Sequence, residues 1–331
     1  RLLRYLPRFR KAYRELDTLA AREGWSRAEI EALQLERLNG IWEHAIAHVP
    51  YYRQMRAKLD LPPRFAGLDE FREAVPLLPN AQARNRSRTL LSERAARGGW
   101  HLTGGSTGSP ARFYWAKEAA LARRRYQYRL FSMWEADIFD RVAFLWGHGA
   151  SFAPGLEGYL ARIRRPVEDW LRNRMRLSPY RVARDDLHGY LKRIAAFRPV
   201  MLYAYSTSAY LLAREAVETG FRCPSLKFVV LTAEPAFPHI VEAVESAFGV
   251  PAIVEYGSSD CGFVAGEWTD RTLRVRDDGT LVETLPRDDG RYDIVATLLD
   301  NPSIPLIRYV TDDVTDVPAD VPRRGFTILE N

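Results

Sequence analysis

A stretch rich in glycine and hydroxyl-bearing residues, from Thr103 to Pro110, has the residue types in this chain that most directly suggest chemistry. Glycine lets a ligand approach the main chain, and consecutive free N–H groups beside Ser and Thr hydroxyls can hold phosphate oxygens. The stretch is neither a Walker A loop nor a Gly-x-Gly-x-x-Gly dinucleotide fingerprint, because the required residues are not at the required spacing. Its composition leaves two interpretations open, a phosphate-binding loop and an ordinary Gly/Ser hairpin turn.

Three polar side chains further along the chain, His148, Glu234 and Asp260, each follow a predicted strand. The apolar runs before them alternate with helical segments, which indicates a parallel sheet covered on both faces. Ligands bind such sheets beyond the carboxyl ends of the strands, so these side chains are candidate site residues. The predicted strands are 142–146, 200–205, 228–231 and 252–256.

The segments before and after this α/β part have different patterns. Residues 1–95 are expected to be helical, and Ser26 with Glu29 predicts a capping box at the start of one helix. Towards the C-terminus the pattern becomes antiparallel and includes a predicted hairpin with its turn at Asp278-Gly279. We therefore expect a helical N-terminal region, 1–95, packed on an α/β domain that covers residues 96–331.

The composition of the chain limits the classes of protein to which it can belong. The 331 residues carry a net charge of +6, with 47% hydrophobic and 27% charged residues, which is typical of a globular chain. No apolar run reaches the roughly 18 residues needed to cross a membrane. Cys223 and Cys261 are too few for a disulfide framework, which favours reduced thiols in a cytoplasmic protein. The arginine clusters at 1–14 and 162–176 lack the interleaved aromatics of a nucleic-acid interface, although the first leaves a peripheral membrane contact open.

The glycine-rich stretch also resembles a known motif. Thr103-Gly-Gly-Ser-Thr-Gly-Ser-Pro110 is similar to the phosphate loop of adenylate-forming enzymes, commonly Thr-Ser-Gly-Ser/Thr-Thr-Gly-x-Pro. The resemblance implies that the first six of these residues bind nucleotide phosphates. They are Thr103, Gly104, Gly105, Ser106, Thr107 and Gly108.

A second segment, Ala252 to Asp260, resembles the second hallmark of the same family, Tyr-Gly-x-Thr/Ser-Glu. In the family the Tyr stacks on adenine and the acid helps to hold magnesium. By position, Tyr256 would stack on adenine. Asp260 would be the magnesium ligand and a catalytic residue, and its side chain is one methylene shorter than the Glu of the family. Carboxylate oxygen suits magnesium. The implied nucleotide-binding segment also contains Gly257, Ser258 and Ser259.

A third segment, Asp293 to Asp313, resembles the family pattern Gly-Glu-x-Val-x-Thr followed by Pro-Leu-Ile-Arg-Tyr-x-x-Gly-Asp. The resemblance implies that Asp313 binds both ribose hydroxyls, since a carboxylate can accept two hydrogen bonds. It also places Arg308 in the nucleotide-binding motif. Asp312 stands where the family has Gly, which puts the geometry of the turn before Asp313 in question.

Two shorter matches add further candidates. Thr232–Ala236 resembles the Gly-Ala/Gly-Glu segment whose backbone flanks adenine, which implies nucleotide contacts at Ala233 and Glu234, with Ala233 replacing Gly. The segment 145–150 lies where the family places a loop beside the substrate carboxylate. His148 is therefore a candidate catalytic residue, and the alternative is a structural loop histidine.

Longer strings, Leu298–Tyr309 and Leu177–Tyr180, are most similar to the phenylacetate–coenzyme A ligase branch and especially to its capsule-polysaccharide-type members. The resemblance implies an α/β fold, the large N-terminal domain of an adenylate-forming enzyme, with ATP and magnesium and with coenzyme A as an open choice of acceptor. We expect no zinc, because Glu267-Trp268 stands where many relatives have a cysteine ligand. Relatives continue into a small mobile C-terminal domain, which we expect to be missing here.

The resulting hypothesis is an AMP-forming acid–thiol ligase that adenylates a small-molecule carboxylic acid and passes the acyl group to coenzyme A or another nucleophile. Positioning and electrostatics can carry such a reaction without a side-chain nucleophile. Two alternatives remain. One is a non-catalytic adenylate-binding or assembly protein, and the other is an acyl-transfer step in polysaccharide or natural-product biosynthesis that uses a preformed donor.

Overall fold

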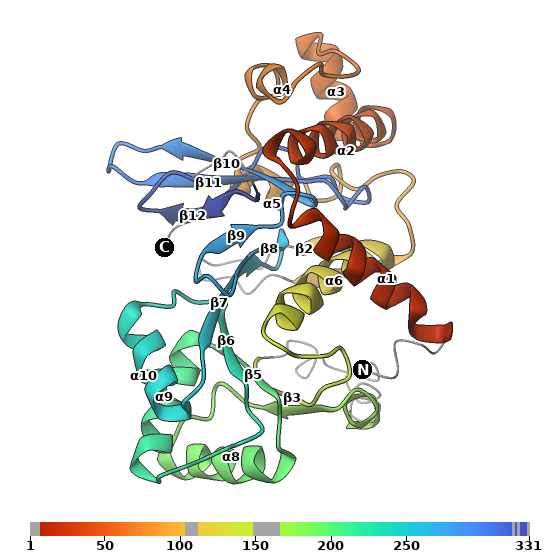
Figure 1. Cartoon of the computed structure of the whole chain (residues 1–331). Coiled ribbons are helices and arrows are strands. Elements are labelled where there is room, and N and C mark those ends of the chain that lie inside the picture. The colour runs from red at the N-terminus through yellow and green to blue at the C-terminus, as the bar shows by residue number, and fades with distance from the viewer. Residues whose placement is uncertain (1–6, 103–111, 148–165, 320–321, 323–324, 330–331) are drawn as a thin grey trace. The chain divides into compact units, whose positions relative to one another are not determined.

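The computed structural model of the chain confirms a mixed α/β fold and describes residues 7–102, 112–147, 166–319, 322 and 325–329 (Figure 1). The chain divides into two compact units. The first unit contains residues 1–129, 257–266 and 272–331, and the second contains 130–256 and 267–271. The boundary predicted near residue 95 falls inside the first unit.

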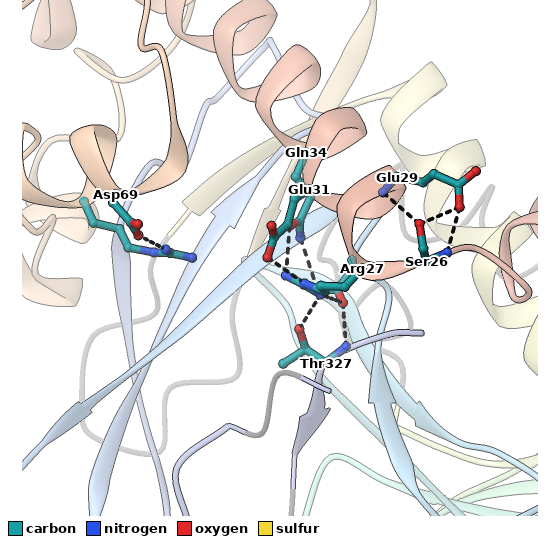
Figure 2. Close-up of polar contacts among 9 residues, drawn as sticks. Ser26, Arg27, Glu29, Glu31, Gln34, Asp69 and Thr327 are labelled. Carbon is teal, nitrogen blue, oxygen red and sulfur yellow. Dashed lines mark hydrogen bonds and ion pairs between the residues drawn. The ribbon is translucent and has the colours of Figure 1, made fainter. Parts of the chain in front are cut away.

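The N-terminal part of the first unit is helical, as predicted. Ser26 and Glu29 form the predicted capping box: the Ser26 amide donates to Glu29 Oε2 at 2.8 Å, and the Glu29 amide donates to Ser26 Oγ at 3.4 Å (Figure 2). The helix that they open buries one face, on which Trp42 is fully buried and packs against Phe65. The helices are α1 (Pro7–Arg22), α2 (Arg27–His48), α3 (Pro50–Leu59), α4 (Leu68–Ala74), α5 (Asn80–Asn85) and α6 (Lys117–Met133), the last of which continues into the second unit.

The strands of the first unit are mostly antiparallel. β10, β11 and β12 form a three-stranded sheet in that order, β1 and β2 form a two-stranded sheet, and β13, β9 and β8 are neighbours in that order. The strands are β1 (Gly98–Leu102), β2 (Arg112–Ala116), β8 (Gly262–Glu267), β9 (Leu273–Val275), β10 (Thr280–Pro286), β11 (Tyr292–Leu298), β12 (Tyr309–Thr315) and β13 (Ile328–Leu329).

The hairpin predicted around Asp278-Gly279 is wrong, although a turn does form there. The amides of Gly279 and Thr280 both donate to the Arg276 carbonyl, at 2.8 and 3.0 Å. The strands on either side, however, enter different sheets, since β9 pairs with β13 and β10 pairs with β11. The turn is also buried, with Asp278 only 3% exposed, because arginines from the N-terminal helices pair with it.

The second unit holds the four predicted strands, β7, β6, β5 and β3, in that order, and a strand that was not predicted, β4, beside β3; every pair is parallel. These strands are apolar along most of their length, as expected when both faces of a sheet are covered. The elements are β3 (Val142–Leu145), β4 (Arg174–Leu177), α8 (Arg184–Phe197), β5 (Met201–Tyr205), α9 (Ser206–Glu218), β6 (Phe228–Thr232), α10 (Pro238–Phe248) and β7 (Ala252–Ser258).

Both faces of these strands are covered. Side chains of α8, α9 and α10 share one core cluster with Ala143, Leu202 and Val229 from the strands. Alternate strand residues point the other way, where Phe131 at the end of α6 packs against Phe228. Within the part of the chain that the structure describes, no helix is both long enough and apolar enough to cross a membrane.

Candidate functional site

The turn after β6 carries two of the predicted nucleotide contacts, Ala233 and Glu234. The Glu234 carboxylate accepts the Thr207 amide at 2.8 Å, and the Glu234 carbonyl accepts the Ser206 hydroxyl at 3.0 Å. The carboxylate therefore caps the N-terminus of α9, where amide groups lack partners and negative charge is favourable.

Two positions at which this chain departs from a motif glycine keep the backbone conformation that glycine favours. Ala233 has φ +66° and Asp312 has φ +67°. Residues with a Cβ adopt this left-handed region at a cost, although Asp tolerates it better than most. The residue before Asp313 thus has the left-handed conformation that favours glycine, within strand β12 and not in a turn.

The second motif is anchored within the first unit by the carboxylate of Asp260. This side chain is 7% exposed, and its two oxygens accept hydrogen bonds from the hydroxyls of Ser258 and of Tyr309 on β12. The Cys261 amide also donates to Asp260 Oδ1, at 3.2 Å. Gly257 is required, because a Cβ there would lie 2.2 Å from the carbonyl oxygen of Gly262.

Strand β2, which begins just after the glycine-rich stretch, contacts both of the other motifs. The indole N–H of Trp115 donates to the Ser259 carbonyl at 3.1 Å. The ring of Phe113 lies edge-on to Tyr309, with 6.3 Å between ring centroids. β2 pairs antiparallel with β1, with Leu102 opposite Arg112. The structure thus joins this pair of strands to the second and third motifs.

Several predicted site residues lie outside the described residues. They are the six phosphate-loop candidates Thr103, Gly104, Gly105, Ser106, Thr107 and Gly108, together with His148. Tyr256 is half-buried on β7 and is the last residue of segment 130–256 of the second unit. The assignments of these residues stay predictions.

Asp313 lies exposed on β12 in the first unit. Its amide donates to the Thr311 hydroxyl at 3.2 Å, and that hydroxyl donates to the Ile294 carbonyl at 2.9 Å. The carboxylate is therefore on a backbone fixed to β11 while its side chain remains accessible. Its charge and that of Asp260 both act on one nearby group, the Cys261 thiol. Two carboxylates from separate motifs thus lie in one neighbourhood.

Arg308 makes extensive contacts within the first unit. Its guanidinium pairs with Glu283, with Nη2 2.9 Å from Oε1, and donates to the carbonyls of Val75 and Arg72 beside α4. The side chains of Arg308 and Glu283 are only 11% and 7% exposed. These contacts indicate that Arg308 joins the helical region to the sheet, and its nucleotide contact stays a prediction.

The described residues show whether this chain has ligands suited to magnesium. Among the described residues, no group of three or more His, Cys, Asp or Glu could hold a metal ion. The Asp260 carboxylate has about four acceptor sites, and the three donors above occupy three of them. Asp260 therefore fits as a single protein ligand to an ion whose remaining ligands are phosphates and water, the usual arrangement for magnesium beside a nucleotide.

Aromatic side chains gather at the carboxyl ends of β3 and β5 in the second unit. The rings of Trp146 and Tyr205 lie 4.4 Å apart, and Tyr203 packs against Trp146. Burial, with the neighbouring Tyr180, raises the pKa of Tyr205 to about 12, so its hydroxyl stays protonated at neutral pH. Trp134 packs on Phe228 and donates to the Glu267 carbonyl at 3.0 Å.

Sequence reasoning missed the residues that link the motifs, above all Tyr309 and Trp115. Both lie in segments that the sequence singles out: Tyr309 ends the string Pro-Leu-Ile-Arg-Tyr, and Trp115 belongs to the aromatic segment after the glycine-rich stretch. The aromatic residue types were a signal that these positions are buried. Their hydrogen-bond partners are distant in sequence and could not be read from it.

The two thiols should differ in reactivity. Burial, helped by the charges of Asp260 and Asp313, raises the pKa of the Cys261 thiol well above its usual range, and the thiolate is the reactive form. Cys223 is half-buried. We expect a thiol-exchange reagent at pH 8 to modify one thiol quickly and the second only after unfolding, with the fast phase lost in Cys223→Ser. A fast phase that survives in Cys223→Ser would contradict the burial of Cys261.

Comparison with known proteins agrees with these motifs. No family model matches the chain. The phenylacetate–coenzyme A ligase of Thermus thermophilus is 26% identical over 91% of this chain and 67% of its own length. Protein CapK of Staphylococcus aureus is 22% identical over 45% of this chain and 34% of its own length. These matches confirm the resemblance to the phenylacetate–coenzyme A ligase branch and to its capsule-type members.

Solved structures show the same fold. A 2-hydroxyisobutyryl–coenzyme A ligase in an open conformation, in complex with its acyl adenylate and coenzyme A, matches 93% of this chain and 70% of its own, with a TM-score of 0.73 and 19% identity. The same ligase in the thioesterification state matches with a TM-score of 0.72 and 20% identity. The chain therefore has the α/β fold of adenylate-forming coenzyme A ligases over nearly its whole length.

Proposed function

We propose that this chain is the adenylating part of an AMP-forming acid–coenzyme A ligase. In the first step an oxygen of the substrate carboxylate attacks the α-phosphorus of ATP, the bond from that phosphorus to the bridging oxygen breaks, and pyrophosphate leaves. In the second step the sulfur of coenzyme A attacks the acyl carbon, the thiol proton is lost and AMP leaves. The similarity to the phenylacetate–coenzyme A ligase and the shared fold support this reaction class, while the acid itself is a small molecule of unassigned structure.

The roles of the residues follow from their motifs. Thr103 to Gly108 would hold the β- and γ-phosphates, Tyr256 and the backbone of Ala233 and Glu234 would contact adenine, and Asp313 would accept both ribose hydroxyls. His148 would lie beside the substrate carboxylate. Asp260 would hold magnesium, which neutralises charge on the phosphates. The backbone of Gly257, Ser258 and Ser259 would complete the nucleotide contacts.

One observation carries the proposal. Within the first unit, the strand that leaves the glycine-rich stretch, the second motif and the third motif are joined by direct contacts of Trp115 with Ser259 and of Tyr309 with Asp260. Residues 115, 260 and 309 are far apart in sequence, so their contacts are not a consequence of local chain geometry. The strand that follows the first motif is thus in contact with the second motif, and the second motif is in contact with the third.

The test is nucleotide binding together with ATP–pyrophosphate exchange, using the purified whole gene product and a panel of aryl and short acyl acids. We expect Asp313→Ala to weaken nucleotide affinity about 100-fold, because two hydrogen bonds to a charged group are lost. Asp316→Ala is the matched control, since it removes an exposed carboxylate just beyond the same strand. It should bind nucleotide like the unmodified protein.

Other outcomes identify the alternatives. Binding of ATP without exchange for any acid would favour a non-catalytic adenylate-binding or assembly protein. Acyl transfer that is indifferent to ATP would favour the use of a preformed donor. If the unmodified protein neither binds nucleotide nor exchanges pyrophosphate, the proposal is wrong.

A further inference from the structure

Tyr309 is a buried phenol whose hydroxyl has one specific partner. Its side chain is fully buried, its ring packs edge-on against Phe113, and its hydroxyl donates to Oδ2 of Asp260. The hydroxyl and the ring are thus both fixed by contacts with other segments of the first unit.

The other oxygen of Asp260 is held from its own loop. Oδ1 accepts the Ser258 hydroxyl and the Cys261 amide. Donors on both oxygens fix the rotation of the carboxylate, because turning the group about its Cβ–Cγ bond would break bonds on both sides. The carboxylate is 7% exposed, and by the count of acceptor sites it can take one more ligand.

Bracing of the loop does not by itself explain why one of these donors comes from β12. A short Asp arm that served only to brace the loop could be satisfied by Ser258 and the Cys261 amide, which both come from the same loop. The donor on Oδ2 comes instead from β12, the strand that carries Asp313 four residues further on. The same strand thus presents one carboxylate and orients another.

We propose that Tyr309 is a positioning residue that orients the Asp260 carboxylate toward the divalent metal ion carried by a nucleoside triphosphate. This inference rests on the proposed function. Tyr309 touches no substrate and acts only through Asp260. Nucleotide binding that needs no metal, such as that of AMP in the presence of a chelator, should then be independent of the Tyr309 hydroxyl.

The experiment compares two affinities by calorimetry in Tyr309→Phe, which keeps the ring and removes the hydroxyl. Affinity for ATP with magnesium chloride should fall about tenfold, the effect of losing one hydrogen bond to a charged group. Affinity for AMP with a chelator should change less than about twofold by the same reasoning, since no bond to the metal ligand is involved. Ser258→Ala removes a donor from the other oxygen and should shift the same ratio in the same direction.

Tyr52→Phe is the matched control. Tyr52 is also fully buried, and its hydroxyl donates to the Pro305 carbonyl at 2.9 Å and accepts the Ile307 amide at 3.2 Å, away from Asp260. It should lose stability as Tyr309→Phe does, while the ratio of the two affinities stays at the value of the unmodified protein. Ser258→Ala provides the test if Tyr309→Phe does not fold.

Each outcome separates the two proposals. An unmodified protein that binds neither ATP nor AMP overturns the proposed function and this inference with it. An unmodified protein that binds both, combined with an unchanged ratio in Tyr309→Phe and in Ser258→Ala, overturns only the positioning role. A ratio that changes equally in Tyr52→Phe also overturns it, because the effect would then follow from lost stability.

Discussion

Replacing Asp277 with alanine is expected to lower the free energy of unfolding by about 3–5 kcal/mol, the usual cost of removing one partner of a buried ion pair. Asp277 is 1% exposed, and its Oδ2 lies 2.9 Å from Nη1 of Arg27 on α2. It also accepts the Gln34 side-chain amide at 3.2 Å and the Thr327 backbone amide at 2.5 Å. Alanine would leave a buried cation and two buried donors without this acceptor.

The loss should be measurable by urea denaturation followed by circular dichroism. Glu31→Gln is the matched control, because Glu31 pairs with the same arginine at 2.9 Å but is 47% exposed (Figure 2). An exposed pair one helical turn apart contributes only about 0.3–0.5 kcal/mol. A loss in Asp277→Ala as small as that of the control would show that this contact does not hold α2 to the turn between β9 and β10.

Replacing Arg308 with methionine is expected to cost a similar amount, about 3–5 kcal/mol, while leaving nucleotide affinity unchanged. The guanidinium is bound by Glu283 and by two backbone carbonyls beside α4, including that of Val75 at 2.6 Å. Methionine keeps most of the side-chain volume and removes every one of these bonds. Glu283, 7% exposed, would be left as a buried charge without its cation.

The double variant Arg308→Met/Glu283→Leu supplies the control, since replacing both partners of a buried pair with apolar residues is often neutral. It should recover most of the lost stability in the same denaturation experiment. Affinity for AMP, measured on the folded protein, should match that of the unmodified chain in both variants. A variant that folds with full stability but no longer binds AMP would instead support the nucleotide contact that the motif predicts for Arg308.

Local signals in the sequence were sufficient for the elements that depend on local physics. The four apolar runs became β3, β5, β6 and β7 of one parallel sheet, because a continuous apolar run suits a strand buried on both faces. The capping box at Ser26 formed because its two partners are three residues apart and need no other part of the chain. The resemblance of the motifs to a known family predicted the fold, which the solved structures share.

Contacts between distant segments were not predictable in this way. The turn at Asp278 has the local pattern of a hairpin, yet β9 and β10 pair with other strands because β11 and β13 compete for them. Tyr309 and Asp260 are 49 residues apart, and Arg308 meets carbonyls more than 200 residues away. Neither partner could be chosen from one sequence, so the supporting contacts of Arg308 were not predicted.

The left-handed conformations of Ala233 and Asp312 have a consequence for how such chains are recognised. A motif written with glycine at both positions does not match this chain. Its main chain nevertheless takes the left-handed conformation that favours glycine at both, with a methyl group or a carboxylate attached. Distant members of such a group will then be found more reliably by the path of the backbone than by the letters along it.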